Sequence, residues 1–373
     1  MTDKEKSELQ KNIVDGIPYM PHGRLILAPR VGKTKIAIDI IKRDKPETIL
    51  WVTPSAELAE KDIPAEFRTW KAEEYLKNLT TTTWMSLHKV KGKFDIIILD
   101  EEQFLTENNA VNLLDGSLSG HILSMTGVET RHQDKQSIYT ALGLKVLYRL
   151  SVNSAVEIGL LSNYQVKVID IEMNRTDKVI KGGNKQNPFM TTEFANYQYL
   201  NKITQQSIFQ GRKDSQFRIL ARRRAIINSL SKDRVTKWLW NNLKGRKLFF
   251  CASIEQANSI TDKTYHSKTD NIQLQKFISG EIDEICMVNA GGTGFTYKSI
   301  DHLVVVQADS DKNGLTVQKI CRTLLAQKDY QAQIWILNLS GTQDENWVNS
   351  ALSKLNKEKI EWVSAKNLLK NEN

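Results

Sequence analysis

Cysteine is scarce in this sequence of 373 residues, which contains three cysteines in all. Cys251, Cys286 and Cys321 lie far apart, form no CxxC pair and belong to no Cys/His cluster. The sequence therefore predicts neither a disulfide framework nor a zinc site. Because each cysteine lies in apolar surroundings, we expect three buried thiols in a protein of a reducing compartment.

Long apolar runs are also missing. No stretch approaches the roughly 18 apolar residues that are needed to span a bilayer. The amino-terminal segment MTDKEKSELQKN is polar and does not resemble a signal peptide. There is no low-complexity tract either. These absences predict a cytoplasmic protein that makes no membrane contact.

The overall composition is that of a soluble globular protein, with 40% apolar and 25% charged residues. The length suits two domains of roughly 150 residues each. Lys and Arg number 52 against 43 Asp and Glu, which gives a net charge of +9. This excess suits a polyanionic partner, although many basic proteins bind no nucleic acid, so the charge alone does not decide the matter.

Short apolar runs alternate with helical patterns along both halves of the chain. The runs are continuous rather than alternating, as expected for parallel strands covered by helices on both faces. In the first half we predict strands at Leu25–Ala28, Ile49–Thr53, Ile96–Leu99 and Ile122–Met125, with helices at Lys35–Lys42 and Ala56–Trp70. In the second half we predict strands at Lys247–Ala252, Glu284–Val288, His302–Gln307 and Gln333–Leu337, with helices at Ile254–Thr261, Asn271–Ser279, Val317–Ala326 and Asn346–Lys354. The halves show no close sequence repeat, but the same α/β architecture is predicted twice.

The composition changes between the halves, from about residue 171 to residue 244. KVIKGGNKQNPFMTTEF is polar and contains Gly and Pro, so we predict a loop there. The stretch Ala195–Leu243 has a helical pattern without a buried strand. Its basic residues are Arg212, Lys213, Arg218, Arg222, Arg223, Arg224, Lys232, Arg234 and Lys237. They form either a solvated helical face or a basic surface that contacts nucleic acid.

The segment RLILAPRVGKT, Arg24 to Thr34, consists of an apolar run, a short loop and the start of a helix. Backbone N–H groups at a helix start bind phosphate, because they are unpaired and aligned with the helix dipole. We predict that the loop Pro29, Arg30, Val31 and Gly32 cradles a phosphate, that Lys33 reaches the β- and γ-phosphates and that Thr34 ligates Mg²⁺. The full pattern has a glycine where this chain has Leu27, and a plain surface turn is the alternative.

The segment FDIIILDEEQ, Phe94 to Gln103, carries an apolar run into a cluster of acids. Asp100 is predicted to hold Mg²⁺ and Glu101 to orient and deprotonate the attacking water. An acidic helix start is the alternative, since carboxylates also favour that position. Four apolar residues directly before the acids, in a segment that follows a Gly-Lys-Thr loop, favour the catalytic interpretation. Together the two segments predict hydrolysis of a nucleoside triphosphate such as ATP.

With these motifs the chain resembles the superfamily 2 helicases and translocases, which are DEAD/DEAH-like proteins with two RecA-like P-loop domains. In the first domain, APRVGKT resembles motif I, WVTPSAEL motif Ia, TWMSL the segment before motif II, DEEQ motif II and SMTG motif III. In the second, LFFCASIEQA resembles motif IV, VNAGGTGFT a motif V of the chromatin-remodeller kind and QKICR motif VI. The resemblance implies domains at 1–170 and 245–373, joined by a loop and a helical basic segment at 171–244.

The resemblance also implies roles for individual residues. Gln10 lies where the family often places a glutamine that reads adenine, and Gln103 occupies the coupling position of motif II, which is often His. Gly294 would contact the nucleotide. Residues implied to lie near the nucleic-acid backbone are Thr53, Pro54, Thr83, Ser86 and Thr296. Such hydroxyl and loop contacts position a strand without reading its sequence, so we expect salt-sensitive binding.

The sequence departs from the family at the arginine that helps to neutralise charge on the γ-phosphate. In motif VI, Arg322 is followed three residues later by Leu325 where a second arginine is usual. Either Arg322 takes this role, or Lys328 does, or hydrolysis is slow, because an arginine finger is worth about 10³-fold or more in rate. A shifted register is the remaining alternative.

What the resemblance implies is an ATP-dependent motor that binds ATP between its two domains and acts on nucleic acid. DNA is the first candidate and RNA the alternative, because the sequence does not decide between the two. Its small size suits phage or bacterial replication, recombination or repair, with proteins of those processes as partners. One alternative is a translocase that moves along duplex DNA without separating the strands. Another is a degenerate ATPase that serves as a nucleotide-gated clamp, which Leu27 and Leu325 would favour.

Overall fold

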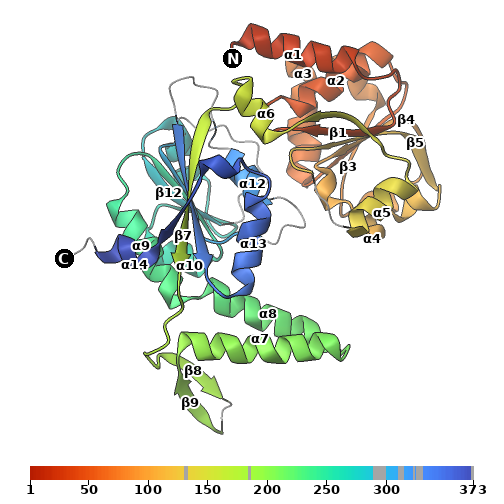
Figure 1. The fold of residues 1–373 in the computed structure, drawn as a ribbon. Coiled ribbons are helices and arrows are strands. Elements are labelled where there is room, and N and C mark those ends of the chain that lie inside the picture. Colours follow the sequence, from red (N-terminus) through yellow and green to blue (C-terminus); the bar gives the residue numbers. More distant parts are fainter. Residues whose placement is uncertain are drawn as a thin grey trace. The chain divides into compact units, whose positions relative to one another are not determined.

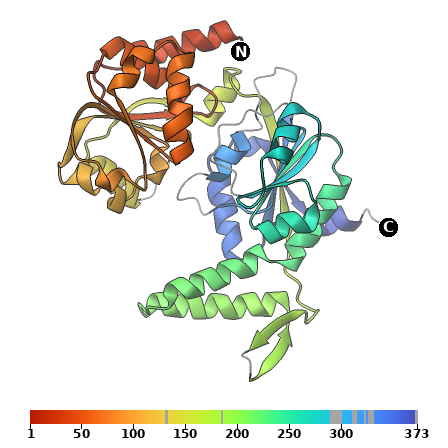
Figure 2. The same ribbon diagram turned by 180° about the vertical axis from the view of Figure 1, so that it is seen from behind.

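The computed structural model describes residues 1–129, 133–183, 186–288, 300–309, 315–321, 324 and 331–370 (Figure 1). The chain forms two compact units. Unit 1 consists of Met1–Asn163 together with Ser310–Tyr330, and unit 2 of Tyr164–Asp309 together with Gln331–Asn373. Each unit is built on its own sheet, and views from opposite sides show helices on both faces of that sheet (Figure 2).

Unit 1 contains a six-stranded sheet in the order β3-β2-β4-β5-β1-β6, with all neighbours parallel. Its strands are β1 (Gly23–Leu27), β2 (Ile49–Thr53), β3 (Leu79–Thr83), β4 (Gly92–Asp100), β5 (Leu118–Thr126) and β6 (Val146–Leu150). Its helices are α1 (Asp3–Asp15), α2 (Lys33–Asp44), α3 (Ile63–Thr69), α4 (Glu107–Leu114), α5 (Gln133–Ala141), α6 (Val152–Glu157) and α12 (Leu315–Cys321). Shorter helical turns lie at Leu58–Asp62, Glu73–Asn78, Leu87–Lys89 and Glu102–Phe104.

The core of unit 1 explains why the sequences of the central strands are continuous apolar runs. Every residue of β2 is buried, as is the end of β4 from Ile96 to Leu99, because helices cover both faces. On one face, Ile97 and Leu99 pack with Ala110 of α4 and Ile138 of α5. The strands therefore end at a common edge, and the loops that follow them are held by a closely packed layer.

Unit 2 contains a seven-stranded sheet in the order β11-β12-β10-β13-β14-β7-β15. Its strands are β7 (Asn163–Ile171), β10 (Lys247–Cys251), β11 (Thr264–Tyr265), β12 (Glu284–Val288), β13 (His302–Val305), β14 (Gln331–Leu339) and β15 (Ile360–Ser364). Its helices are α7 (Glu193–Phe209), α8 (Ser215–Ile227), α9 (Leu230–Asn242), α10 (Ile254–Ile260), α11 (Ile272–Ser279), α13 (Gln343–Leu352) and α14 (Ala365–Leu369), with a 3₁₀ turn at Lys357–Lys359. The fold thus confirms the predicted α/β class with parallel sheets.

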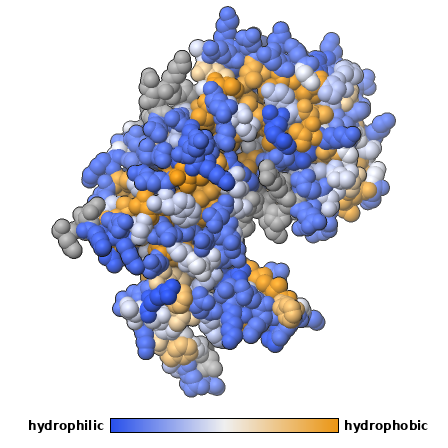
Figure 3. Space-filling model, in the orientation of Figure 1, coloured by the Kyte–Doolittle hydropathy of each residue, from blue (hydrophilic) through white to orange (hydrophobic). Residues whose placement is uncertain are grey.

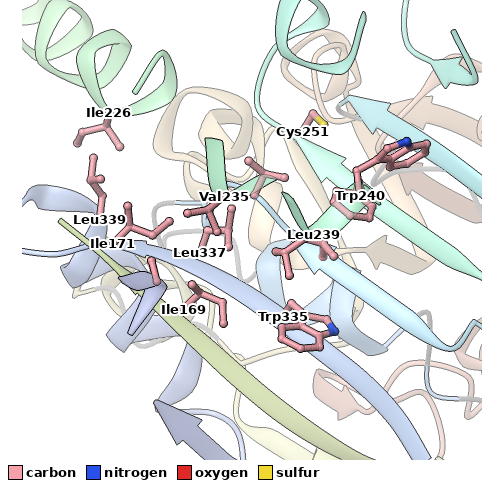
Figure 4. Packing of buried hydrophobic residues seen from close by; sticks show 14 of the residues in the cluster. Ile169, Ile171, Ile226, Val235, Leu239, Trp240, Cys251, Trp335, Leu337 and Leu339 are labelled. Carbon is pink, nitrogen blue, oxygen red and sulfur yellow. The ribbon is translucent and has the colours of Figure 1, made fainter. Parts of the chain in front are cut away.

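Helix α9 covers one face of this second sheet (Figure 4). Val235 and Leu239 of α9 pack against Leu337 of β14 and Ile169 of β7 in one buried cluster. In the same cluster the Trp240 ring meets the Phe249 ring edge to face at 5.1 Å. Helix α9 therefore holds β7 and β14 within a single core.

A buried ion pair links α9 to the opposite side of unit 2. Lys232 Nζ lies 2.6 Å from Asp344 Oδ2, and both side chains are fully buried. Lys232 also donates to Gln307 Oε1 at 3.0 Å, and the backbone N–H of Leu339 donates to Asp344 at 3.0 Å. The pair thus joins α9, α13 and the carboxyl end of the sheet without an unmatched charge.

The segment at 171–244 is helical as predicted at α7, α8 and α9, but its first part is not a loop. β8 (Ile180–Gly183) and β9 (Pro188–Thr191) form an antiparallel two-stranded sheet. Its residues are largely exposed on both faces, so the sequence there shows no apolar alternation. An exposed two-stranded hairpin leaves little signal of this kind, which explains why the loop prediction was wrong.

The compact units differ in two places from the domain limits expected from sequence, which remain predictions. β7, near the end of the range 1–170, lies between β14 and β15 in the second sheet. Helix α12, within the range 245–373, is grouped with unit 1. The chain therefore passes between the units more than once.

Among the described residues, no helix is both long and apolar enough to cross a membrane. Cys251, Cys286 and Cys321 are free and buried, as predicted. Burial raises the pKa of the Cys321 thiol to about 12, and it also raises the pKa of Cys286. The thiols of Cys286 and Cys321 are therefore held in the neutral, unreactive form.

Candidate nucleotide-binding site

The loop that was predicted to cradle a phosphate lies between β1 and α2. β1 ends at the fully buried Leu27, and α2 begins at Lys33 with Gly32 as its N-cap. Ala28 and Val31 are buried and anchor the loop. Since the first N–H groups of a helix have no partner within it, the start of α2 offers donors to an anion.

Gly32 is required at its position for two reasons. Its φ of +91° lies in the left-handed region that side chains disfavour. A Cβ added there would lie 2.4 Å from Gln10 Nε2. Gln10 of α1 is buried, and this same nitrogen donates to the backbone carbonyl of Val31 at 2.7 Å. Gln10, which was predicted to read adenine, thus holds the β1–α2 loop in this structure through its hydrogen bond to Val31. Arg30 also has a positive φ, of 71°.

Lys33 meets the acidic segment across the end of the sheet. Its Nζ lies 3.1 Å from Glu101 Oε1, with the two side chains 15% and 23% exposed. Gly127, which follows β5, approaches the same lysine, since a Cβ there would lie 3.4 Å from Lys33 Nζ and 3.3 Å from Pro29 Cγ. The structure therefore brings together the two segments that the sequence singled out, and it adds Gly127 to them.

Glu101 has an uncommon backbone conformation and a closely defined side chain. Its φ of 56° and ψ of 61° place it in the left-handed region, at the turn between β4 and the 3₁₀ helix Glu102–Phe104. Its Oε2 accepts hydrogen bonds from Gln103 Nε2 at 2.8 Å and from Gln318 Nε2 of α12 at 3.0 Å. Two amides thus fix one carboxylate oxygen, while the other faces Lys33.

Gln103 links Glu101 to the end of β5. Its Oε1 accepts from Thr126 Oγ1 at 3.0 Å, and Thr126 in turn accepts from the backbone N–H of Val128 at 3.2 Å. Lys135 of α5 donates to the backbone carbonyls of Gln103 and, at 2.6 Å, of Leu105. The residue predicted for the coupling position of motif II therefore lies in a continuous hydrogen-bonded path from Glu101 to β5.

Asp100 is electrostatically poised for a cation. Burial, together with the neighbouring Glu101 carboxylate, raises the pKa of Asp100 to about 7, against the opposing effect of Lys33. Its backbone carbonyl accepts from Trp84 Nε1 at 2.9 Å, which fixes the turn. The ionised form of this carboxyl group is disfavoured because too little positive charge lies nearby. A bound divalent cation would supply that charge.

The oxygen donors present fit Mg²⁺ rather than a metal held entirely by protein. Asp100 supplies a carboxylate, and Thr34, in the first turn of α2, supplies a hydroxyl. No cluster of three His, Cys, Asp or Glu ligands occurs in the part of the chain that the structure describes. Mg²⁺ in nucleotide sites needs only one or two protein ligands, because water and phosphate oxygens complete its shell.

A buried network behind the acids was missed by the sequence reading. Glu102 is fully buried and accepts from Arg24 at the start of β1, with Nη2 and Oε1 2.5 Å apart, and from Ser124 Oγ. The Arg24 guanidinium lies 3.7 Å from the centre of the Tyr139 ring. Burial raises the pKa of Tyr139. An arginine inside an apolar strand run was the one signal available, because such a charge needs a buried partner.

The residues predicted to contact nucleic acid in unit 1 lie on two adjacent strand ends. Thr53 of β2 and Thr83 of β3 are register partners. Thr53 is fully buried and its hydroxyl donates to Ser55 O at 2.8 Å, so it has no free proton for a phosphate. Pro54, Thr83 and Ser86 are partly exposed. The structure brings these residues together, and their contact with nucleic acid remains a prediction.

The basic run on α8 lies in unit 2. Arg222 donates to Asn201 Oδ1 at 2.9 Å, and the Arg223 guanidinium lies 6.0 Å from the centre of the Trp347 ring. Arg223 and Arg224 are exposed. Gly294, Thr296 and Arg322, as well as Leu325 and Lys328, lie outside the described residues, so their roles remain predictions.

No protein-family model matches the chain, and no curated protein matches it in sequence. Solved structures do match its fold. The helicase domain of Pyrococcus furiosus Hef is 13% identical, with a TM-score of 0.50 and coverage of 93% of this chain and 97% of that one. S. cerevisiae Dbp5 bound to RNA and ADP BeF3 is 10% identical, with a TM-score of 0.58 and coverage of 97% and 91%. A point variant of Dbp5 with the same ligands gives 0.57 at 10%, with coverage of 98% and 91%. These likenesses show that the chain has the two-domain RecA-like fold of such helicases.

Proposed function

We propose that this protein is an ATP-dependent helicase or translocase that acts on nucleic acid, with DNA as the first candidate. The observation that carries the proposal is the approach of Lys33 and Glu101 to 3.1 Å, beside Gly32, whose positive φ opens the loop at the start of α2. The fold shared with helicases supports the same activity. Replication, recombination or repair in the cytoplasm of a bacterium or a phage-infected host is the finer proposal.

The residues of unit 1 divide the chemistry of hydrolysis among them. The N–H groups at the start of α2 and the ammonium of Lys33 would bind the phosphates. Thr34 and Asp100 would hold Mg²⁺, which neutralises charge on the phosphate oxygens when it is bound. Glu101, held by Gln103 and Gln318, would orient the attacking water and take its proton.

Nucleic acid is the proposed effector for two reasons. The net charge of +9 favours contact with a phosphate backbone. Both Dbp5 structures contain RNA together with a nucleotide analogue. Partly exposed Thr83 and Ser86, on the edge strand β3 and just after it, would supply contacts that carry no sequence information.

Turnover of ATP with different nucleic acids tests this proposal directly. We expect hydrolysis to be stimulated severalfold by nucleic acid, and the rates with single-stranded DNA, duplex, fork and RNA to rank the substrates. Glu101→Gln should bind ATP but hydrolyse it at a rate lower by about 10² or more. The matched control is Glu107→Gln, an exposed acid on α4. Turnover that no nucleic acid affects, or normal hydrolysis by Glu101→Gln, would contradict the proposal.

A nucleotide-gated clamp is the second candidate, because the strand residue Leu27 replaces the first glycine of the usual phosphate loop. A clamp would bind nucleic acid in an ATP-dependent way without turnover. If the wild-type protein shows no stimulated hydrolysis and Lys33→Ala keeps its function, the clamp replaces the motor. Unwinding of a fork, compared with displacement of a triplex strand, separates a helicase from a duplex translocase.

A further inference from the structure

Helices α7 and α8 form a hairpin in unit 2 whose free end is apolar and exposed. Phe209, the last residue of α7, is 93% exposed, and Phe217 in the first turn of α8 is 76% exposed. Ile208 and Leu220 are exposed beside them. Apolar residues gather near this end of the hairpin in the space-filling view (Figure 3). Exposed apolar side chains that gather in one place are typical of a binding surface, whereas singly scattered ones are ordinary.

The turn that carries these side chains is rigidly built. Ser207, which is buried, donates to Asp214 Oδ1 at 2.7 Å, and Arg218 Nε donates to Asp214 Oδ2 at 2.7 Å. The backbone N–H of Arg212 donates to Ser207 O at 3.0 Å, and Gly211 takes a φ of 61° to close the turn. The serine and Arg218 bonds lower the pKa of Asp214. The two phenylalanines are therefore held out by a fixed scaffold and not by a loose loop.

The other end of the hairpin is attached to the body of unit 2. The backbone N–H of Gln343 in α13 donates to Tyr197 OH at 2.8 Å, and Tyr197 is buried. Buried Thr204 donates to Leu200 O at 2.7 Å and to Arg218 O at 3.1 Å, which joins the two helices midway. The apolar end is thus the part of a supported element that is left without a partner in the described chain.

The hairpin is rich in cations, of which Arg212, Lys213 and Arg218 lie in or next to the turn that carries the two phenylalanines. The hairpin from Glu193 to Ile227 contains seven basic and two acidic residues: Lys202, Arg212, Lys213, Arg218, Arg222, Arg223 and Arg224 against Glu193 and Asp214. On α8, Phe217, Leu220 and Arg224 follow the i, i+3, i+7 spacing of one helix face, and all three are exposed. A protein partner would need only the apolar contacts, whereas this excess of positive charge is complementary to phosphate.

We infer that the end of the α7–α8 hairpin binds unpaired nucleobases, with Phe209 and Phe217 as stacking surfaces and the flanking cations on the phosphates. The inference rests on the proposed function and names its substrate class: nucleic acid with a single-stranded segment next to a duplex. Stacking tolerates any base, because every base offers a π-face. Each stacked base changes affinity by a factor of about 5 to 100.

Binding of matched oligonucleotides by the full-length chain tests the inference. The probes are a blunt DNA duplex and the same duplex with a single-stranded fork, with 2-aminopurine in the first unpaired position. The wild-type chain should prefer the fork. The double variant Phe209→Ala/Phe217→Ala should lose about 10-fold or more of its affinity for the fork and change its affinity for the blunt duplex by less than about twofold. The double variant should also lose the quenching of 2-aminopurine. The conservative variant Phe209→Trp, with Phe217 unchanged, should keep both the fork affinity and the quenching.

The control is Trp362→Ala, which removes an exposed aromatic from β15, away from the hairpin in the sequence. It should leave both affinities unchanged, and thermal unfolding should show that all variants fold. Equal loss on fork and blunt duplex, or no loss on either, would overturn the inference. It would also be overturned if the double variant kept its fork affinity but abolished a self-association that the wild type shows in sedimentation, since the surface would then be a protein contact.

Failure of the inference is distinguishable from failure of the proposed function. A wild-type chain that binds neither probe and whose ATP turnover neither probe affects would refute the motor itself, and the inference with it. A wild-type chain that binds and hydrolyses normally, with fork affinity that is indifferent to Phe209 and Phe217, would refute the hairpin's role alone.

Discussion

Each unit buries an ion pair whose carboxylate follows the end of a strand, but the two pairs hold different elements in place. Arg24 and Glu102 in unit 1 approach to 2.5 Å, and Lys232 and Asp344 in unit 2 to 2.6 Å, with almost no exposure in either case. In each pair the carboxylate also accepts a further hydrogen bond, from Ser124 or from the Leu339 backbone. A buried ion pair with a further hydrogen bond to its carboxylate therefore occurs in both units.

The difference lies in what adjoins each carboxylate. Glu102 directly follows Glu101, so its bonds to β1 and β5 fix the turn that presents the candidate catalytic base. Asp344 lies in the first turn of α13, whose Gln343 donates to Tyr197 and so supports the α7–α8 hairpin. A buried pair of this kind costs desolvation and adds little net stability, but breaking one partner is expensive. Variants of the two pairs should both lower the free energy of unfolding, but only a variant of the unit 1 pair should also lower ATP turnover.

The largest effect is expected for Glu102→Ala. It leaves the Arg24 charge buried without its partner, so we expect a loss of about 3–5 kcal/mol in the free energy of unfolding. ATP turnover should fall as well, because the turn at Glu101 loses its support. Denaturant unfolding and turnover of the remaining folded protein measure the two effects. Turnover per folded molecule equal to that of the wild type would show that Glu102 only supports folding.

Asp344→Ala sharpens the comparison from the other unit. It leaves Lys232 buried and unpaired, with a similar expected loss of about 3–5 kcal/mol. ATP turnover without nucleic acid should be unchanged below the unfolding transition, whereas fork binding through the hairpin should weaken. If Asp344→Ala and Glu102→Ala lowered turnover per folded molecule equally, the proposed division of labour would be wrong.

The third effect is a pH dependence of the free energy of unfolding, which we expect from Asp100 in unit 1. The folded pKa of Asp100, about 7, lies above the ordinary value of 3.8, so between these values the folded protein binds the extra proton. The stability that this proton supplies is complete below pH 4 and is lost as the pH rises to 7, on the order of 2 kcal/mol after allowance for partial exposure. Unfolding at a series of pH values without nucleotide or Mg²⁺ should show this slope, and Asp100→Asn should remove it. A slope that survives in Asp100→Asn belongs to another group.

The smallest effect is expected for Ser124→Ala. It removes one hydrogen bond to the Glu102 carboxylate and leaves the ion pair with Arg24 intact, so a loss of about 1.5 kcal/mol is expected. Denaturant unfolding measures it, with Ser137→Ala on the exposed face of α5 as control. A loss as large as that of Glu102→Ala would mean that Ser124, and not Arg24, is the main partner of Glu102.

Much of the fold was predictable because buried parallel strands are continuous apolar runs. β1 and β2 were placed at or near their observed limits for this reason, whereas only the buried carboxyl-terminal half was predicted for β4 and β5. β3, with the sequence LTTTT, was missed because it is a partly exposed edge strand without an apolar run. β6 was missed as the opposite edge strand, with a similar exposure.

The candidate site was predictable only where its residues belong to one short sequence motif. Gly32 and Lys33 at a helix start, and Asp100 and Glu101 at a strand end, follow from short motifs. In the structure Lys33 and Glu101 lie 3.1 Å apart. The contacts of Gln10 with Val31 and of Arg24 with Glu102 join residues 21 and 78 positions apart. Such pairs depend on the order of strands in the sheet, which apolar runs do not specify.

The position of β7 has a consequence for how the chain is made. β7 is complete at Ile171, but its sheet neighbours β14 and β15 begin only at Gln331 and Ile360. The ribosome adds ~5–20 residues per second, so the wait from β7 to β14 lasts on the order of ten to thirty seconds. During that time an apolar strand with two open edges has no native partner. The newly synthesised chain should therefore depend on chaperones until its last strand emerges.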